Sequence, residues 1–141
     1  MSYFVDTNIL VYARDATEPE KQERSHLWLS HLWRNRSGRI SYQVLQEYYV
    51  IVTCKLDPGL RVTEARDDIR DFLAWNPISI ERNVIEAAWS VQDRFKFSWW
   101  DALIIAAAQV LDCDYLLSED MQHKQVVDGL TILNPFLEEL Q

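Results

Sequence analysis

Glycine and proline are scarce in this chain of 141 residues, which contains only three and four of them, respectively. Linkers and disordered segments are usually enriched in these residues, so the composition excludes a linker-rich or disordered protein. Hydrophobic residues make up 48% of the sequence, which is enough for a substantial core at this length. We therefore expect a single domain over residues 1–141.

Cysteine is rare as well, and long apolar runs are missing. Cys54 and Cys113 lack the paired spacing of a zinc site or a disulfide framework, so we expect reduced thiols. The longest apolar stretch, near residues 102–108, is far too short to span a membrane, and the N-terminus lacks the pattern of a secretory signal. These absences lead us to expect a cytoplasmic protein that does not associate with membranes.

Basic residues are outnumbered by acidic ones, 14 against 22, which gives a formal net charge of −8. This balance argues against a broad basic surface for duplex nucleic acid, and therefore against a simple DNA-binding module. It does not exclude an enzyme that acts on phosphodiesters. Carboxylates gathered around divalent ions raise the acidic count, while the bound metal restores positive charge locally.

Short apolar segments alternate with amphipathic ones along the chain. Strands are predicted at Tyr3–Asp6, Ile40–Ser41, Ile78–Ile80, Tyr115–Leu117 and Leu130–Leu133. Helices are predicted after a cap at Thr7 or Asn8 and at Glu18–Arg34, Tyr42–Lys55, Thr63–Trp75, Asn83–Phe95 and Trp99–Leu111. This alternation indicates an α/β fold, a three-layer α/β/α sandwich with a mainly parallel central sheet.

Four acids occupy comparable places in this predicted fold. Asp6 and Asp120 follow strands, whereas Glu47 and Asp101 lie near the beginnings of helices. Ligands of such sheets gather beyond the carboxyl ends of the strands, so these positions can converge on one cleft. All-oxygen ligands favour Mg²⁺ or Mn²⁺ over zinc, and the recurrence of such acids suggests a metal site.

Asp6 lies in the apolar run Phe4–Val11, and no basic residue follows until Arg14. A buried carboxylate is costly unless it is hydrogen-bonded, protonated or bound to a cation. Taken alone, Asp6 fits a plain helix N-cap better than a metal ligand, because Asp is common at a strand-to-helix turn. Thr7 and Asn8 can serve the same cap, or they can orient the Asp6 carboxylate by hydrogen bonds.

Glu47 and Asp101 share the absence of a cation three or four residues away on the helix. The neighbours of Glu47 at that spacing are Gln43, Val44, Val50 and Ile51. Those of Asp101 are Phe97, Ser98, Ile104 and Ile105. Glu47 can still be an exposed acid on a half-apolar helix, and Asp101 can complete a capping box with Ser98.

The fourth position is ambiguous because two acids follow one another in Ser118-Glu119-Asp120. Either Asp120 or Glu119 can be the metal ligand, and either can simply take part in a turn. The three histidines have no spacing that favours ligation, so we expect them on the surface.

Several segments taken together resemble the PIN domain family, and VapC-type toxins of toxin–antitoxin pairs in particular. The segments that carry the resemblance are Phe4–Leu10, Gln46–Glu47, Trp100–Ala108 and Leu117–Asp120. The likeness implies that Asp6, Glu47, Asp101 and Asp120 are the metal-binding, catalytic acids. It also implies supporting roles for the polar side chains of Thr7, Asn8 and Ser118.

The resemblance implies a divalent-metal-dependent endoribonuclease using Mg²⁺ or Mn²⁺, with RNA as substrate. It further implies a homodimer that a cognate antitoxin protein inhibits. Attack by water predicts products without a 2′,3′-cyclic phosphate. A degenerate PIN fold that binds RNA or protein without catalysis remains the alternative. A phosphatase of the haloacid dehalogenase type is disfavoured, because Asn8 stands where that pattern needs a second aspartate.

Overall fold

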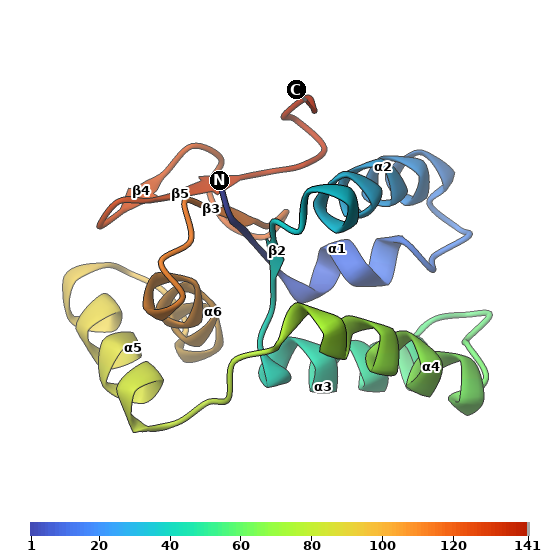
Figure 1. Cartoon of the computed structure of the whole chain (residues 1–141), viewed down its shortest axis with the longest axis horizontal. Helices are drawn as coiled ribbons and strands as arrows, with labels where there is room; N and C mark the ends of the chain where they lie inside the picture. Colours follow the sequence, from blue (N-terminus) through green and yellow to red (C-terminus); the bar gives the residue numbers. More distant parts are fainter. Residues whose placement is uncertain (141) are drawn as a thin grey trace.

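A five-stranded sheet forms the centre of the computed structural model, which describes residues 1–140 (Figure 1). Its strand order is β2-β1-β3-β5-β4, and every neighbouring pair is parallel except β4 with β5. The strands are β1 (Tyr3–Val5), β2 (Gly38–Arg39), β3 (Tyr115–Leu117), β4 (Val126–Val127) and β5 (Leu130–Leu133). The predicted mainly parallel sheet is confirmed.

Helices cover this sheet in two groups, which confirms the α/β/α class. The helices are α1 (Thr7–Tyr12), α2 (Pro19–Asn35), α3 (Tyr42–Val50), α4 (Val62–Phe72), α5 (Arg82–Arg94) and α6 (Trp99–Val110). In Figure 1, α5 and α6 lie side by side below the sheet, while α1 to α4 form the group on the right. Within residues 1–140, no helix combines the length and the apolar character needed to cross a membrane.

The order in which the chain adds strands to the sheet reverses between β1 and β3. The connection from β1 runs outward to β2, and the next connection returns across β1 to β3. Since parallel crossovers are right-handed, these two connections pass on opposite faces of the sheet. The carboxyl ends of β1 and β3 therefore flank the point at which such sheets bind their ligands.

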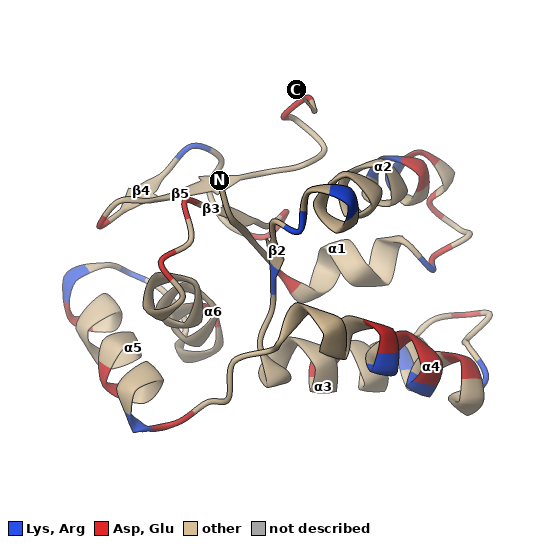
Figure 2. Ribbon diagram, viewed as in Figure 1, with Lys and Arg blue, Asp and Glu red and all other residues tan. Residues whose placement is uncertain are grey.

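The innermost layer is built from the strands and α6. Phe4 and Val5 of β1 and Leu116 and Leu117 of β3 are completely buried. Buried parallel strands carry continuous apolar runs, because helices cover both of their faces. The run Ala102–Ala108 on α6 is likewise buried along its whole length. Figure 2 shows the difference from α4, which carries many charged residues, whereas α6 is nearly free of them.

Two predicted strands were wrong in extent. Pairing with β1 begins at Gly38 rather than at Ile40, because Gly38 has no side chain where the ring of Trp75 lies. Ser41 instead caps α3, where its hydroxyl accepts a hydrogen bond from the Val44 N–H at 3.3 Å. The predicted strand Ile78–Ile80 is reduced to a single parallel bridge between Ser41 and Ile78.

Two predicted helices are interrupted near their C-termini. The segment Tyr42–Lys55 consists of α3 and a π-helical turn, η1 (Ile51–Lys55). The segment predicted as Thr63–Trp75 leaves the α-helical path at Phe72 and continues as a 3₁₀ turn, η2 (Leu73–Trp75). This turn places Trp75 against Gly38, a long-range contact that helical periodicity does not encode.

The edge strand β4 was not predicted. It is only two residues long and pairs with β5 through the turn Asp128-Gly129, in which both residues have positive φ. Such a turn favours a tight hairpin, and an Asp-Gly pair is its typical sequence. The signal was therefore present, although the strand itself was too short to show any alternation.

Candidate active site

A cavity of about 340 Å³ lies beyond the carboxyl ends of β1 and β3. Its acidic lining residues are Asp6, Asp15, Glu47, Asp101 and Asp120, and none of its described lining residues is lysine or arginine. The volume is at the lower end of the range typical of ligand sites. The structure thus brings the four predicted acids together at one cavity.

Asp6 is the most enclosed of these acids, with 7% of its surface exposed. Its Oδ1 accepts a hydrogen bond from the Thr7 N–H at 2.7 Å, and its Oδ2 accepts one from the Ser118 hydroxyl at 2.7 Å. Its own N–H donates to the Leu117 carbonyl at 3.0 Å, which continues the pairing of β1 with β3. Asp6 is also the N-cap of α1, so the cap and the cavity acid are the same side chain.

Burial raises the pKa of Asp6 to about 7, because removal from water disfavours the ionised carboxylate. The hydrogen bonds from Ser118 and Thr7 lower this pKa and only partly oppose the effect of burial. The negative charges of Asp120 and Asp101 raise it further. An ionised Asp6 is therefore costly here without a positive charge nearby.

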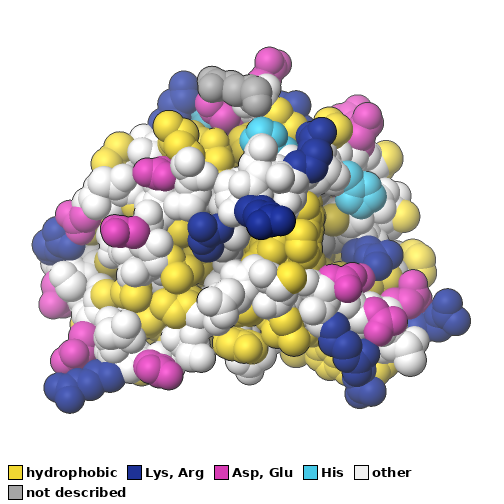
Figure 3. Space-filling view, viewed as in Figure 1, with side chains coloured by type: hydrophobic (Ala, Val, Ile, Leu, Met, Phe, Trp, Pro, Cys, Tyr) yellow, Lys and Arg dark blue, Asp and Glu magenta, His cyan; other side chains and the backbone are white. Residues whose placement is uncertain are grey.

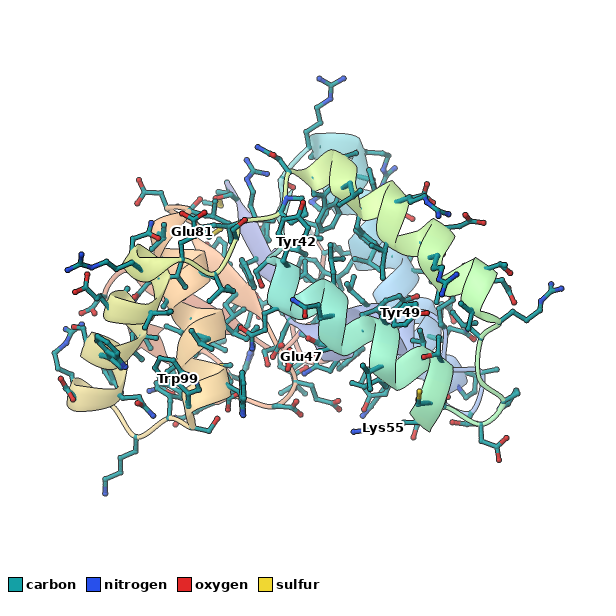
Figure 4. The ribbon with its side chains drawn as sticks, turned by 90° about the horizontal axis from the view of Figure 1, so that it is seen from below. Tyr42, Glu47, Tyr49, Lys55, Glu81 and Trp99 are labelled. Atoms are coloured by element: carbon teal, nitrogen blue, oxygen red, sulfur yellow. The ribbon has the colours of Figure 1, made fainter. Side chains whose placement is uncertain are left out.

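Glu47 reaches the same cavity from α3. The Thr7 hydroxyl donates a hydrogen bond to Glu47 Oε1 at 2.9 Å, so Thr7 connects the carboxylates of Asp6 and Glu47. Figure 4 shows Glu47 on the side of α3 that faces α6, whereas Tyr49 lies on the side toward α4. No basic side chain is paired with Glu47 among the described residues.

Asp101 lies in the first turn of α6 and is set there by its cap. Ser98 is the N-cap of the helix, and its hydroxyl accepts the Asp101 N–H at 3.2 Å. The pKa of the Asp101 carboxyl is raised, first by partial burial and then by the charge of Asp120, while the Ser98 hydroxyl lowers it. Among the described residues, no hydrogen bond from the Ser98 N–H to the Asp101 carboxylate completes a capping box, so the helix cap places Asp101 without occupying its carboxylate.

Asp120 and Glu119 point to different surroundings. The Asn8 side-chain amide donates to Asp120 Oδ2 at 2.9 Å, and the Asp120 N–H donates to the Ser118 hydroxyl at 3.2 Å. Glu119 instead forms a salt bridge with Lys21 of α2 and is absent from the described lining of the cavity. The geometry therefore favours Asp120 over its rival Glu119 as a cavity acid.

Asp15 is the acidic residue of the cavity lining that the sequence patterns missed. Its Oδ1 accepts hydrogen bonds from the Thr17 N–H at 3.0 Å and from the Thr17 hydroxyl at 2.6 Å. The Asp-x-Thr pattern is typical of a turn, and nothing in it signals a cavity wall. Only the end of α1 brings Asp15 to the acids.

The donor set of the cavity suits a hard divalent cation. Its carboxylate oxygens are the ligands that Mg²⁺ and Mn²⁺ prefer, and the missing lysine or arginine leaves their charge uncompensated in the described lining. Within residues 1–140, however, no three Asp, Glu, His or Cys side chains stand at metal-binding spacing. A cation would therefore have to draw the carboxylates closer together.

A second cavity, of about 500 Å³, lies between α3 and α4. Its walls include Tyr42, Leu45, Tyr49 and Ile69, and no acidic residue is found in its described lining. Figure 4 shows Tyr42 and Tyr49 along α3 on this side. Without carboxylates this cavity lacks the oxygen ligands of the first one, so it is not a candidate for a metal site.

The fold and its acidic cavity define an α/β protein with a candidate metal site at the switch point of a parallel sheet. The family model of the PIN domain matches residues 3–129. The chain therefore belongs to the PIN domain family, as its sequence motifs predicted. No curated protein matches the chain in a sequence comparison.

Three solved structures with the same fold are a toxin or toxin–antitoxin complexes. A toxin–antitoxin complex from Klebsiella pneumoniae has 18% identity and a TM-score of 0.62, covering 95% of this chain and 98% of that one. VapBC2 from Rickettsia felis, bound to a DNA fragment from its promoter, has 20% identity and a TM-score of 0.65, with coverages of 94% and 97%. Mycobacterium tuberculosis VapC20, a Sarcin-Ricin loop cleaving toxin, has 21% identity and a TM-score of 0.60, with coverages of 84% and 92%.

Proposed function

We propose that this PIN domain is a divalent-metal-dependent endoribonuclease that hydrolyses RNA phosphodiester bonds. The observation that carries the proposal is the cavity itself, where buried Asp6 lies with further carboxylates and without a lysine or arginine in the described lining. Asp6, Glu47, Asp101 and Asp120 would hold Mg²⁺ or Mn²⁺ through their oxygens. The bound cation would lower the pKa of water and neutralise charge on the phosphate.

The chain's own residues hold these acids in place. The Thr7 N–H donates a hydrogen bond to one oxygen of Asp6, and the Ser118 hydroxyl donates one to the other. Together they fix the orientation of the Asp6 carboxylate. Thr7 and Asn8 restrain Glu47 and Asp120 in the same way. Hydrogen bonds of this kind fix the orientation of ligands, which supports Thr7, Asn8 and Ser118 as positioning residues.

We also propose that the protein is the toxin of a toxin–antitoxin pair. The three structural relatives described above are a toxin or toxin–antitoxin complexes, and they are matched over nearly their whole length. A cognate antitoxin is the partner that this likeness supports, and a homodimer is the assembly we expect. Co-expression with the product of an adjacent small reading frame should abolish toxicity, and persistent toxicity would count against that partner.

The catalytic proposal is tested by incubating the purified protein with single-stranded RNA and Mn²⁺. Cleavage should stop when a chelator is added and should fall at least about 100-fold in Asp101→Asn, since a ligand of the reacting centre is lost. The new ends should carry no 2′,3′-cyclic phosphate. Chelator-resistant cleavage would refute the metal site, and binding of RNA without any cleavage would favour the non-catalytic alternative.

A further inference from the structure

Trp100 is an exposed tryptophan at the edge of the acidic cavity. It is 62% exposed, more than any other of the six tryptophans, and it directly precedes Asp101. Trp28 and Trp75, by comparison, are buried in the core. Core packing therefore does not account for the Trp100 side chain, although a tryptophan in an apolar helix usually packs inside.

The cavity includes Trp100 in its wall together with Asp101 and Ile104 of α6. Residues 100 and 104 are one helical turn apart, so they share the face of α6 that borders the cavity. Figure 4, in which the preceding Trp99 is labelled, shows α6 beside α3, from which Glu47 projects. Trp100 therefore stands on the rim, next to the acids and open to solvent.

The backbone beneath Trp100 is held on two sides. The Gln43 side-chain amide of α3 donates to the Trp100 carbonyl at 3.4 Å. The Ser98 cap fixes the same turn through the Asp101 N–H, and the Ala102 N–H donates to the Ser98 carbonyl at 2.9 Å. An indole on so restrained a turn is presented to a ligand with little loss of backbone entropy.

Positively charged side chains cannot supply much RNA affinity at this place. None of the described lining residues is lysine or arginine, and the whole chain carries a formal charge of −8. Figure 3 shows, on the face drawn, Lys and Arg side chains separated by uncharged and acidic ones. Stacking on an aromatic ring is a source of affinity that needs no positive charge, because every base offers a flat π-face.

We propose that the indole of Trp100 stacks on a nucleobase beside the scissile phosphate and thereby positions the RNA over the acids. This inference rests on the proposed ribonuclease function and adds a substrate-binding residue to it. Trp100 acts on the base, while the carboxylates act at the phosphate. Only an unpaired base exposes its face to such a ring, so the contact selects loops or single strands at that nucleotide.

The test measures binding of a fluorescein-labelled single-stranded oligoribonucleotide by anisotropy in Ca²⁺, which shares the oxygen ligands of the site. Trp100→Ala should weaken binding about 5- to 150-fold, the range expected for one lost base stack. Trp100→Phe should restore affinity to within about threefold of the wild type. Trp89→Ala is the matched control, since Trp89 is 54% exposed on α5 but does not line the cavity, and it should bind as the wild type does.

A second readout links the ring to a base. Each nucleotide around the cleavage site is replaced in turn by an abasic ribose, and KM and kcat are measured with Mn²⁺. At one position, removal of the base should mainly raise KM for the wild type. With that abasic RNA, Trp100→Ala should not raise KM any further. This non-additivity identifies the stacked base, because both changes then remove the same contact.

Stacking on Trp100 and ribonuclease activity can fail independently in these experiments. Wild-type affinity in Trp100→Ala, or no binding of RNA by the wild type, would overturn the stacking. Binding that depends on Trp100 without any Mn²⁺-dependent cleavage would leave the stacking intact and refute the ribonuclease. A dimer that dissociates in Trp100→Ala while RNA affinity stays unchanged would overturn the stacking and assign this face to a second copy.

Discussion

Asp6 has two roles that usually belong to different residues. It caps α1 and ties β1 to the segment after β3, and it also brings a carboxylate into a site that disfavours its charge. A structural cap alone would be served by a neutral asparagine without the cost of burying a charge. A carboxylate at this place therefore supports the proposal that Asp6 binds a positively charged ligand.

The stability of the metal-free protein should depend on pH through the Asp6 carboxyl. The folded-state pKa of Asp6, about 7, lies above its unfolded value near 4, so the folded state binds the extra proton. Stability is therefore lost as the pH rises through this window. In chelator, Asp6→Asn should gain stability relative to the wild type by on the order of 2 kcal/mol between pH 5 and pH 8.

Urea unfolding at the two pH values measures this difference. Asp93→Asn, which changes an exposed acid on α5, is the control and should follow the pH dependence of the wild type. A constant difference between Asp6→Asn and the wild type would mean that Asp6 is ionised without cost, which contradicts the account of its surroundings.

A second prediction separates the adjacent acids Asp120 and Glu119. Asp120→Asn should weaken Mn²⁺ binding at least tenfold, whereas Glu119→Gln should change it less than about threefold, because Glu119 is paired with Lys21. Both variants remove one negative charge at nearly the same place, so general electrostatics cannot explain a difference. Calorimetric titration with Mn²⁺ decides between them, and the reverse order would make Glu119 the ligand.

The site residues were predictable to the extent that the sequence shows acids without partners. Asp6 in its apolar run, and Glu47 and Asp101 without helical cations, pointed to one place, and the structure puts them at one cavity. The choice between Asp120 and Glu119 was not predictable, because it depends on Lys21 almost 100 positions away. Asp15 gave no signal beyond a turn.

At the scale of the elements, the contact between β2 and η2 holds an edge of the sheet. A Cβ at Gly38 would lie 2.4–2.7 Å from ring atoms of Trp75, closer than real contacts allow. Gly38→Ala should therefore destabilise the protein by about 1–3 kcal/mol through overpacking. The neighbouring Ser37→Ala is the control, because the buried Ser37 hydroxyl has no hydrogen-bond partner among residues 1–140.

Denaturant unfolding of both variants tests the contact. Ser37→Ala should be at least as stable as the wild type, because it removes a buried polar group and no hydrogen bond. Equal stability of Gly38→Ala and the wild type would show that Trp75 moves freely away from β2, and the explanation for the shifted strand would then fail.

Elements with strong local patterns were predictable, and those set by distant contacts were not. The apolar run of α6 and the buried strands β1 and β3 follow from their sequences. The beginning of β2 depends on Trp75, and the strand expected at Ile78–Ile80 survives only as one bridge to Ser41. In these cases tertiary packing overrides local propensity.

For the whole molecule, the acidic balance predicts how RNA binding responds to salt. The cavity offers no lysine or arginine in its described lining, so few counterions are released when RNA binds. A plot of log affinity against log salt concentration should have a slope shallower than about −2 for the single-stranded RNA. Trp100→Ala should lower the affinity at every salt concentration and keep the same slope.

Anisotropy titrations between low and moderate salt provide this plot. A slope as steep as that of proteins with many phosphate contacts would show that a basic surface outside the cavity dominates binding. The dispersed positive side chains in Figure 3 argue against such a surface on the face drawn. With such a steep slope, Trp100 would contribute little to RNA affinity, and the protein would behave as a general RNA binder.

The acids at the switch point form the proposed cation site. Crystals soaked in Mn²⁺ test it directly, because the anomalous signal locates the ion without reference to activity. We predict a peak inside the cavity in contact with carboxylate oxygens of Asp6 and Asp101, and none there in crystals of Asp101→Asn. A cavity without a peak at saturating Mn²⁺, or a peak elsewhere on the molecule alone, would contradict the account.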